Sequence, residues 1–217
     1  MPRRAKAEYL LTDPNFYAFG LNSEIVAEAV HYVHRTFDDI DSKLTENGGD
    51  RIGGLVELAN LSAIIGNLFR AGVIKGGPGK FKANGPHKYP DLLGTGPGCE
   101  DVEIKVALEG NKPKGHLIKP GPHILVRYVL IGDDGRFSKE ARGLIVKIWE
   151  VRVGRLDDAH FNVSNTAGDS GKTAVINAAG MEACHVVYCD LTAAPVGEKA
   201  LAIFRGRLTG GGLFPRT

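Results

Sequence analysis

The segment from Tyr89 to Lys105 constrains the fold of this chain more strongly than any other. The stretch Thr95-Gly96-Pro97-Gly98 has the composition of a turn, and strand-like apolar runs stand on both sides of it. We therefore expect a hairpin that returns Asp91 to the side of Glu103. Side chains on a strand alternate between two faces, so Glu103 and Lys105 share one face. The other face, directed toward a core, carries Val102, Ile104, Val106 and Leu108.

Two carboxylates and a lysine on this hairpin are suited to metal chemistry. Mg²⁺ prefers oxygen ligands, commonly one or two carboxylates together with substrate phosphate and water. Asp91 and Glu103 supply such oxygens, and the main-chain carbonyl of Ile104 can join them. Lys105 beside the metal can hold or deprotonate an attacking water and stabilise charge that builds on a phosphate. The residues thus predict a Mg²⁺ site, in which Mn²⁺ can substitute, for phosphodiester hydrolysis.

Asp91 after Pro90, followed by Glu103-Ile104-Lys105 on a strand, resembles the signature of the PD-(D/E)XK nuclease superfamily, which includes many type II restriction endonucleases. The resemblance covers about seventeen residues. It implies an α/β fold with a central mixed sheet flanked by helices, with Asp91, Glu103 and Lys105 as catalytic residues. Some members carry an accessory glutamate on a helix before the hairpin, which implies Glu57 as a further metal ligand. The competing interpretation of Glu57 is a surface glutamate favoured by the helix dipole.

Three alternatives to a restriction enzyme remain open. Glu103 and Lys105 could form only a solvated pair on a surface hairpin, an interaction of little energetic value. A repair or structure-specific nuclease would use the same catalytic residues, and a non-enzymatic nucleic-acid-binding module would use none of them. The compact length of 217 residues and the lack of a motor motif favour the restriction role. An enzyme that cuts a palindrome in double-stranded DNA is expected to act as a homodimer.

Positive charge is concentrated on both sides of the hairpin. The net charge is only +2, but no acidic residue occurs from Leu58 to Pro90 or from Gly110 to Gly132. Arg70 and Lys75 belong to the first of these segments. Basic segments of this kind bind the phosphates of nucleic acids. The expected DNA contacts are Lys80, Lys82, Lys88, Lys112, Lys114, His116 and Lys119.

The segment from Thr166 to Thr173 nearly spells a phosphate-binding P-loop. Thr166 stands where such a loop needs its first glycine, and the preceding residues do not form a buried apolar strand, so an NTPase is disfavoured. The same polar residues suit a DNA-recognition loop. Its expected contacts are Asn165, Asp169, Ser170, Lys172 and Thr173.

Two helices are expected before the hairpin. The first begins at Asn22 or Ser23 and ends at Asn47. It carries an apolar seam that either joins two protomers or packs on its own core. The seam consists of Val26, Val30, Val33, Phe37, Ile40 and Leu44. The second helix, Ile52 to Ala71, is apolar on nearly all sides and is expected to be buried.

The remaining predictions concern the whole chain. Strands are expected at His123–Ile131, Leu144–Val153 and His185–Leu191, in a mixed sheet with helices on its faces. We expect residues 1–217 to form one domain, with a basic arm at 1–8 and a mobile tail at 209–217. Cys99, Cys184 and Cys189 read as reduced thiols of a cytoplasmic protein, and a zinc site there is disfavoured.

Overall fold

The structure is a computed structural model, and it describes Arg3 and residues 10–86, 88–164 and 173–196. Its centre is a five-stranded sheet with the order β1 (Leu10–Thr12), β12 (His185–Asp190), β9 (Ile145–Leu156), β8 (Gly121–Ile131) and β6 (Glu103–Leu108). β6 runs parallel to β8, and all other neighbours are antiparallel. The predicted mixed sheet and the three predicted strands are confirmed. None of the helices in the described ranges is long and apolar enough to span a membrane.

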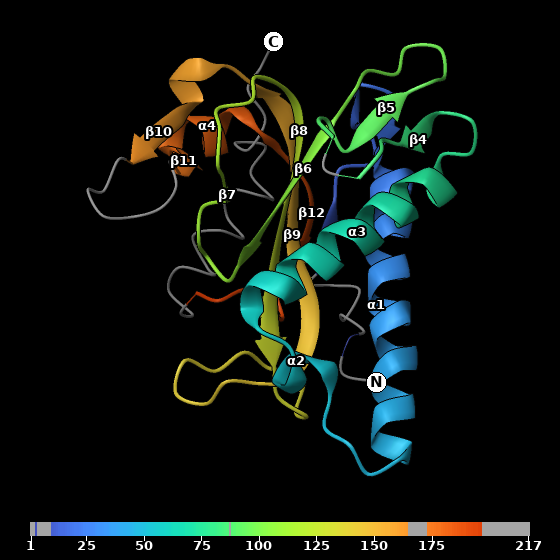
Figure 1. Cartoon of the computed structure of the whole chain (residues 1–217), viewed down its shortest axis with the longest axis vertical. Coiled ribbons are helices and arrows are strands. Elements are labelled where there is room, and N and C mark those ends of the chain that lie inside the picture. The colour runs from blue at the N-terminus through green and yellow to red at the C-terminus, as the bar shows by residue number, and fades with distance from the viewer. Residues whose placement is uncertain (1–2, 4–9, 87, 165–172, 197–217) are drawn as a thin grey trace.

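Helices α1 (Ser23–Glu46) and α3 (Leu58–Gly76) cover one face of this sheet (Figure 1). α1 begins as predicted, because the Asn22 side chain accepts a hydrogen bond from the Ile25 amide. Val33 and Phe37 of its apolar seam are fully buried in the core of the same chain. Of the two alternatives for this seam, packing on the core of the same chain is therefore the one that the structure shows for these residues.

The second predicted helix is divided in two. α2 covers only Ile52–Leu55, and Val56 and Glu57 then have extended backbone with ψ of 137° and 145°. Two glycines lie within α2, and glycine disfavours a helix, which accounts for its short length. α3 buries a single face rather than its whole surface. That face consists of Leu61, Ile65, Phe69, Gly72 and Val73.

A small sheet and a short helix cover part of the opposite face of the central sheet. The small sheet has the order β10 (Phe161–Ser164), β11 (Thr173–Ile176) and β7 (Lys114–Gly115), and the 3-10 helix η2 (Asp158–His160) and α4 (Ala178–Ala183) lie beside it. Phe161, Ile176 and Met181 pack against Leu125 and Leu156 of the central strands. The predicted sheet with helices on its faces is thus confirmed, and a second, smaller sheet that was not predicted adds to the cover of this face.

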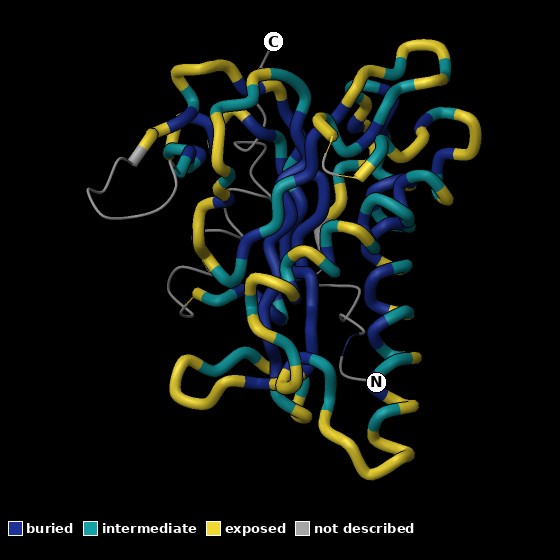
Figure 2. Tube along the Cα trace, in the orientation of Figure 1, coloured by how far each residue is buried: buried dark blue, intermediate teal, exposed yellow. Residues whose placement is uncertain are grey.

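The central strands are buried along most of their length, whereas β6 lies at the edge of the sheet (Figure 2). Two short strand pairs complete the described elements, β2 (Tyr17–Ala18) with β3 (Leu21–Asn22) and β4 (Phe81–Ala83) with β5 (Leu92–Gly94). β5 also meets the beginning of β6 through a bridge between Leu92 and Val102. The turn between β5 and β6 therefore lies beside β6, the edge strand of the central sheet.

The basic N-terminal arm has one described residue, and it is not free. Arg3 is 4 % exposed, donates to the Val146 carbonyl at 2.8 Å, and forms ion pairs with Asp38 and Asp41 of α1. Arg3 therefore joins α1 to β9. The other residues of the arm, the tail at 209–217 and residues 165–172 lie outside the described residues.

Candidate active site at the edge of the sheet

The predicted hairpin forms and brings Asp91 to β6. Leu92 and Val102 exchange both backbone hydrogen bonds, at 3.0 and 2.9 Å. In the turn, the Cys99 amide donates to the Gly96 carbonyl at 3.1 Å, and Gly98 has a φ of +69°, which favours glycine. The Ile104 amide then donates to Asp91 Oδ2 at 2.9 Å. The prediction that Asp91 returns to this strand is confirmed.

Strand β6 alternates as expected between a core face and a polar face. Ile104 is buried in the core against the helices, and Glu103, only 3 % exposed, points to the opposite face with Lys105. The N–H and C=O of one strand residue face the same edge. Because the Ile104 N–H faces Asp91, its carbonyl oxygen faces the same open edge, where the sequence predicted a metal ligand.

The Glu103 carboxylate has one occupied and one free oxygen. Oε1 accepts hydrogen bonds from Lys105 and, at 2.9 Å, from Lys119. Oε2 is buried and has no hydrogen-bond partner. Burial alone would raise the pKa of Glu103, but the two ammonium groups outweigh it and hold that pKa below its ordinary value. Glu103 is therefore an ionised carboxylate with a free oxygen, and this suits a cation.

Asp91 has the opposite electrostatic character. Burial raises the pKa of Asp91 above its ordinary value, and the neighbouring Glu103 carboxylate raises it further, against the opposing effects of the Ile104 amide and Lys105. Two adjacent carboxylates with pKa values displaced in opposite directions are characteristic of functional sites. A divalent cation between them would relieve their mutual repulsion.

Lys119 belongs to the site itself, although the sequence suggested only a DNA contact for it. Besides binding Glu103, its ammonium lies 4.5 Å from the centre of the Tyr89 ring. The Tyr89 hydroxyl donates to the Pro120 carbonyl at 2.8 Å, which attaches this loop to the residues before Asp91. Burial raises the pKa of Tyr89, as do Glu103 and Asp101. Lys119 thus helps to set the orientation of the Glu103 carboxylate.

His123 is the second residue that sequence reasoning did not assign to the site. It pairs with Glu103 in the parallel β6–β8 register and is fully buried. Its Nδ1 lies 2.9 Å from the Gly121 carbonyl, which can only accept, so Nδ1 carries the proton and the partnerless Nε2 does not. Burial lowers the pKa of His123 despite the hydrogen bond to Gly121, and Lys105 lowers it further. Without the strand pairing, no signal in the sequence connects His123 with Glu103.

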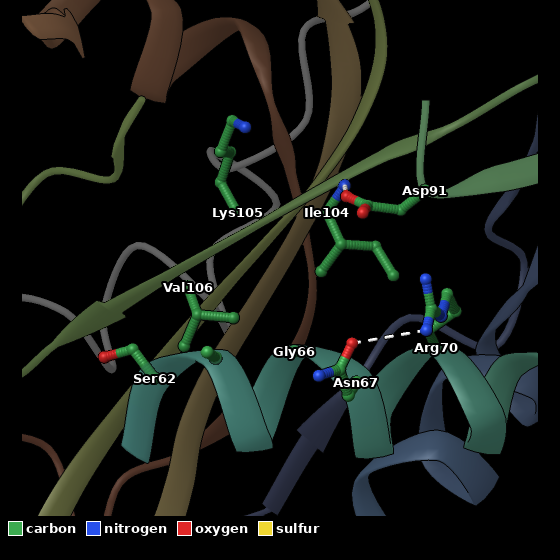
Figure 3. A pocket seen from close by; sticks show the side chains of 9 residues that line it. Ser62, Gly66, Asn67, Arg70, Asp91, Ile104, Lys105 and Val106 are labelled. Atoms are coloured by element: carbon green, nitrogen blue, oxygen red, sulfur yellow. Dashed lines mark hydrogen bonds between the residues drawn. The ribbon is translucent and has the colours of Figure 1, made fainter. Parts of the chain in front are cut away.

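A cavity of about 320 Å³ opens between α3 and the edge of β6 (Figure 3). Asp91 and Lys105 line it from the hairpin, and Arg70 lines it from α3. A second cavity of about 620 Å³ shares Ser62 and Val106 with the first and continues along the β6 edge. Lys112 and Lys114, two of the expected DNA contacts, line this second cavity. Together the cavities border most of the open strand.

Glu57, the other acidic candidate, does not join the site, and neither does Asp101 of the turn. Glu57 is an exposed N-cap residue of α3, and the helical rise places it roughly 20 Å along the axis from Arg70. The structure therefore does not bring Glu57 to the other predicted metal ligands, because α3 begins at this residue. Asp101 Oδ1 accepts from the Gly94 amide at 2.9 Å and closes the turn.

The predicted DNA contacts are largely exposed around the site. Strand β4 lies on one side of β6, and β7 lies on the other (Figure 1). Lys82 of β4 and Lys88 after it are exposed. In the segment after β6, Lys112, Lys114 and His116 are exposed. Lys80 is partly engaged, since it donates to the Gly20 carbonyl at 3.3 Å. Of the proposed recognition loop, Thr173 lies in β11, whereas Asn165, Asp169, Ser170 and Lys172 lie outside the described residues.

The donor set fits Mg²⁺ better than a metal that needs a complete protein cage. Within the described ranges, no three His, Cys, Asp or Glu side chains gather into a metal-binding group. Mg²⁺ sites commonly use one or two carboxylates and fill their remaining positions with water and substrate phosphate. Asp91, the free oxygen of Glu103 and the Ile104 carbonyl meet that requirement. No protein-family model, curated protein or solved structure matches this chain.

Proposed function

We propose that this chain is a Mg²⁺-dependent endonuclease of the PD-(D/E)XK type that cleaves double-stranded DNA at a specific sequence, as type II restriction enzymes do. The observation that carries this proposal is the convergence of Asp91, Glu103 and Lys105 at one open strand edge, with a buried and partnerless oxygen on Glu103. The surface-pair alternative is disfavoured, because Glu103 is buried and not solvated.

Asp91, Glu103 and the Ile104 carbonyl would hold the metal. Bound there, Mg²⁺ or Mn²⁺ supplies a Lewis acid for the phosphate and lowers the pKa of a water molecule. Lys119 keeps Glu103 oriented through its hydrogen bond to Oε1. The Lys105 ammonium, on the same strand face, donates to the attacking water and to the non-bridging phosphate oxygens as negative charge grows on them.

The reaction is hydrolysis of one phosphodiester bond. The oxygen of a water molecule attacks phosphorus opposite the 3′ oxygen, the attacking water gives a proton to the solvent, and the bond from phosphorus to the 3′ oxygen breaks. The products are a 5′-phosphate and a 3′-hydroxyl, which takes up a proton. The exposed lysines on both sides of β6 neutralise the backbone and keep the phosphate in line for this attack.

The restriction role adds three expectations. Cleavage of a palindrome calls for two sites related by a two-fold axis, so we propose a homodimer whose interface lies away from the buried seam of α1. The overall architecture would belong to the restriction-endonuclease-like α/β folds. The protein would act in the cytoplasm with its cysteines reduced, in agreement with the free thiols of the structure.

Plasmid cleavage tests the proposal. The purified protein with Mg²⁺ is expected to give discrete fragments from double-stranded plasmid, and neither Glu103→Gln nor Lys105→Ala should do so. Cuts confined to branched DNA would replace the restriction role with a structure-specific nuclease, and binding without cleavage would favour a non-enzymatic module. Activity that persists in EDTA or in Lys105→Ala would overturn the assigned mechanism.

A further inference from the structure

The cavity between α3 and β6 contains an arginine without an acidic partner. The Arg70 side chain extends from α3 toward Asp91 in Figure 3. Within the described part of the chain, its one hydrogen bond is to Asn67 Oδ1 at 3.2 Å, and it forms no ion pair. By contrast, Arg152 and Arg155 each bind a glutamate. Arg70 therefore has most of its five N–H donors free at the wall of the proposed active site.

The charge around Arg70 favours an anionic ligand. No acidic residue occurs between Leu58 and Pro90, which includes all of α3. Arg70 is the cation whose side chain extends from α3 at this cavity, whereas the Lys105 side chain points to the other face of β6 (Figure 3). Among the described lining residues the one carboxylate is Asp91, which accepts a hydrogen bond from the Ile104 amide. A guanidinium fork matches two oxygens of a phosphate, and the Asn67 amide oxygen restrains its orientation.

Gly66 keeps this cavity open. Apart from proline, glycine is the residue least favourable to a helix interior, so its presence in the middle of α3 calls for a cause. Packing does not supply one, because a Cβ at Gly66 would meet only Val106 Cγ2, at 3.4 Å. At Gly72 of the same helix, a Cβ would come within 2.7 Å of the Ala29 backbone, so helix packing does require that glycine. Gly66 instead leaves room in the cavity, which it lines together with Arg70.

We propose that this cavity is a phosphate subsite, in which Arg70 holds a backbone phosphate of the bound DNA strand beside the scissile one. The proposal rests on the proposed nuclease function, since that function defines which phosphate is cleaved. It adds a ligand-binding residue that lies outside the hairpin. It also defines a path for the strand, from the cavity at Arg70 along the β6 edge toward Lys112 and Lys114.

Arg70→Gln and Lys75→Gln form a matched pair for the test. Each removes one positive charge from α3, but Lys75 lies over the Tyr32 ring, 5.4 Å from its centre, and does not line the cavity. Binding of a fluorescent duplex is measured by anisotropy in Ca²⁺ over a series of salt concentrations. We expect Arg70→Gln to weaken binding at least about tenfold and to lower the salt slope by about one. Lys75→Gln should stay within about twofold of the wild type, and equal effects of the two variants would overturn the subsite.

Filling the cavity gives an independent measurement. Gly66→Leu should weaken duplex binding as Arg70→Gln does, and its thermal unfolding midpoint should not fall, because leucine favours a helix more than glycine does. Gly66→Ala, which adds one methyl group, should bind DNA more tightly than Gly66→Leu. If Gly66→Leu is folded and binds the duplex like the wild type, the cavity does not hold DNA.

The outcomes separate this subsite from the proposed function. If duplex binding depends on Arg70 but not on Lys75, and the protein does not cleave DNA in Mg²⁺, the subsite proposal is supported and the nuclease proposal is contradicted. If the protein cleaves DNA and Arg70→Gln and Lys75→Gln affect cleavage equally, the nuclease proposal is supported and the subsite proposal is contradicted. Competition by inorganic phosphate at concentrations similar to those of the duplex would show a site for free phosphate and would overturn the assignment to a DNA strand.

Discussion

Asp91 and Asp101 stand on the two sides of one turn, yet the structure gives their carboxylates different partners. The Asp91 carboxylate accepts a hydrogen bond from the Ile104 amide, beside Glu103. The Asp101 carboxylate instead accepts a hydrogen bond from the Gly94 amide, which closes the turn. We therefore expect Asp91→Asn to abolish Mn²⁺ binding, measured by titration calorimetry, together with plasmid cleavage. Asp101→Asn is the matched control and should retain both. If Mn²⁺ binding survives in Asp91→Asn and disappears in Asp101→Asn, Asp101 and not Asp91 is the metal ligand.

The three cysteines differ in their expected reactivity. Cys184 is 2 % exposed, and burial raises the pKa of its thiol to about 12. Burial also raises the pKa of Cys189, whereas Cys99 lies at an intermediate depth in the turn. Thiolates are the form that reacts with iodoacetamide. The native protein at pH 8 should therefore be alkylated at Cys99 alone, as shown by mass spectrometry, and the denatured protein at all three.

That experiment includes its own control. Rapid alkylation of Cys184 in the native protein would show that the strand after α4 opens to solvent, contrary to its burial. Protection of Cys99 would show that the turn is covered in solution.

At the scale of single residues, the sequence predicted those parts of the site that depend on local geometry. The period of two along a strand places Glu103 and Lys105 on one face, and a short turn returns Asp91 to them. Lys119 and His123 reach Glu103 only because β8 pairs in parallel with β6 after a connection through β7. Such pairing depends on the whole sheet, and no pattern within either strand indicates it.

The same distinction applies to whole elements. α1 and the central strands were predicted because capping residues and apolar runs are local signals. The local pattern showed that the seam of α1 is buried, but not whether its partner is the same chain or a second one. The break between α2 and α3 was missed because an apolar run continues through it, while Gly53 and Gly54 shorten the first helix.

His34 links two of these elements through a hydrogen bond that requires its neutral form. Its Nε2 accepts from the Ile148 amide of β9 at 2.9 Å. Burial lowers the pKa of His34 to about 3, and the charges of Arg3, Lys147 and His31 also lower it. In the unfolded chain the pKa lies near 6.5. Below that pH the unfolded state binds a proton that the folded state does not, so stability is complete above pH 6.5 and decreases toward pH 3.

The measurement is urea unfolding as a function of pH. One proton changes the free energy of unfolding by about 1.4 kcal/mol per pH unit, so His34 should remove roughly 2 to 3 kcal/mol between about pH 6.5 and pH 4.5. His34→Gln should be less stable than the wild type at neutral pH but should have a pH slope that is smaller by one proton. His31→Gln, at an exposed position on the same helix, is the matched control, because it leaves the hydrogen bond between His34 and Ile148 in place and should retain the contribution of His34 to the slope. Parallel curves for the wild type and His34→Gln would show that His34 titrates alike in both states.

At the scale of the whole molecule, the candidate site sits where stability and function oppose each other. Glu103 is a buried charge with an oxygen that has no hydrogen bond, and such an oxygen is costly within a folded protein. The two lysines on its other oxygen reduce this cost without removing it. A cation bound between the hairpin and β6 would satisfy the free oxygen and hold the two segments together. The metal should therefore stabilise the entire fold.

Thermal unfolding tests this coupling without knowledge of any DNA sequence. A ligand that binds only the folded state at one hundred times its Kd adds about 2.7 kcal/mol of stability, which corresponds to roughly 5 to 10 °C in Tm for a chain of this size. We expect Mn²⁺ to produce such a rise in the wild type and none in Glu103→Gln. Glu100→Gln, which removes a carboxylate paired with the exposed Arg155 at 2.6 Å, should retain the rise. Equal shifts in Glu103→Gln and the wild type would place the bound metal elsewhere on the protein, because the free oxygen of Glu103 would then contribute nothing to its binding.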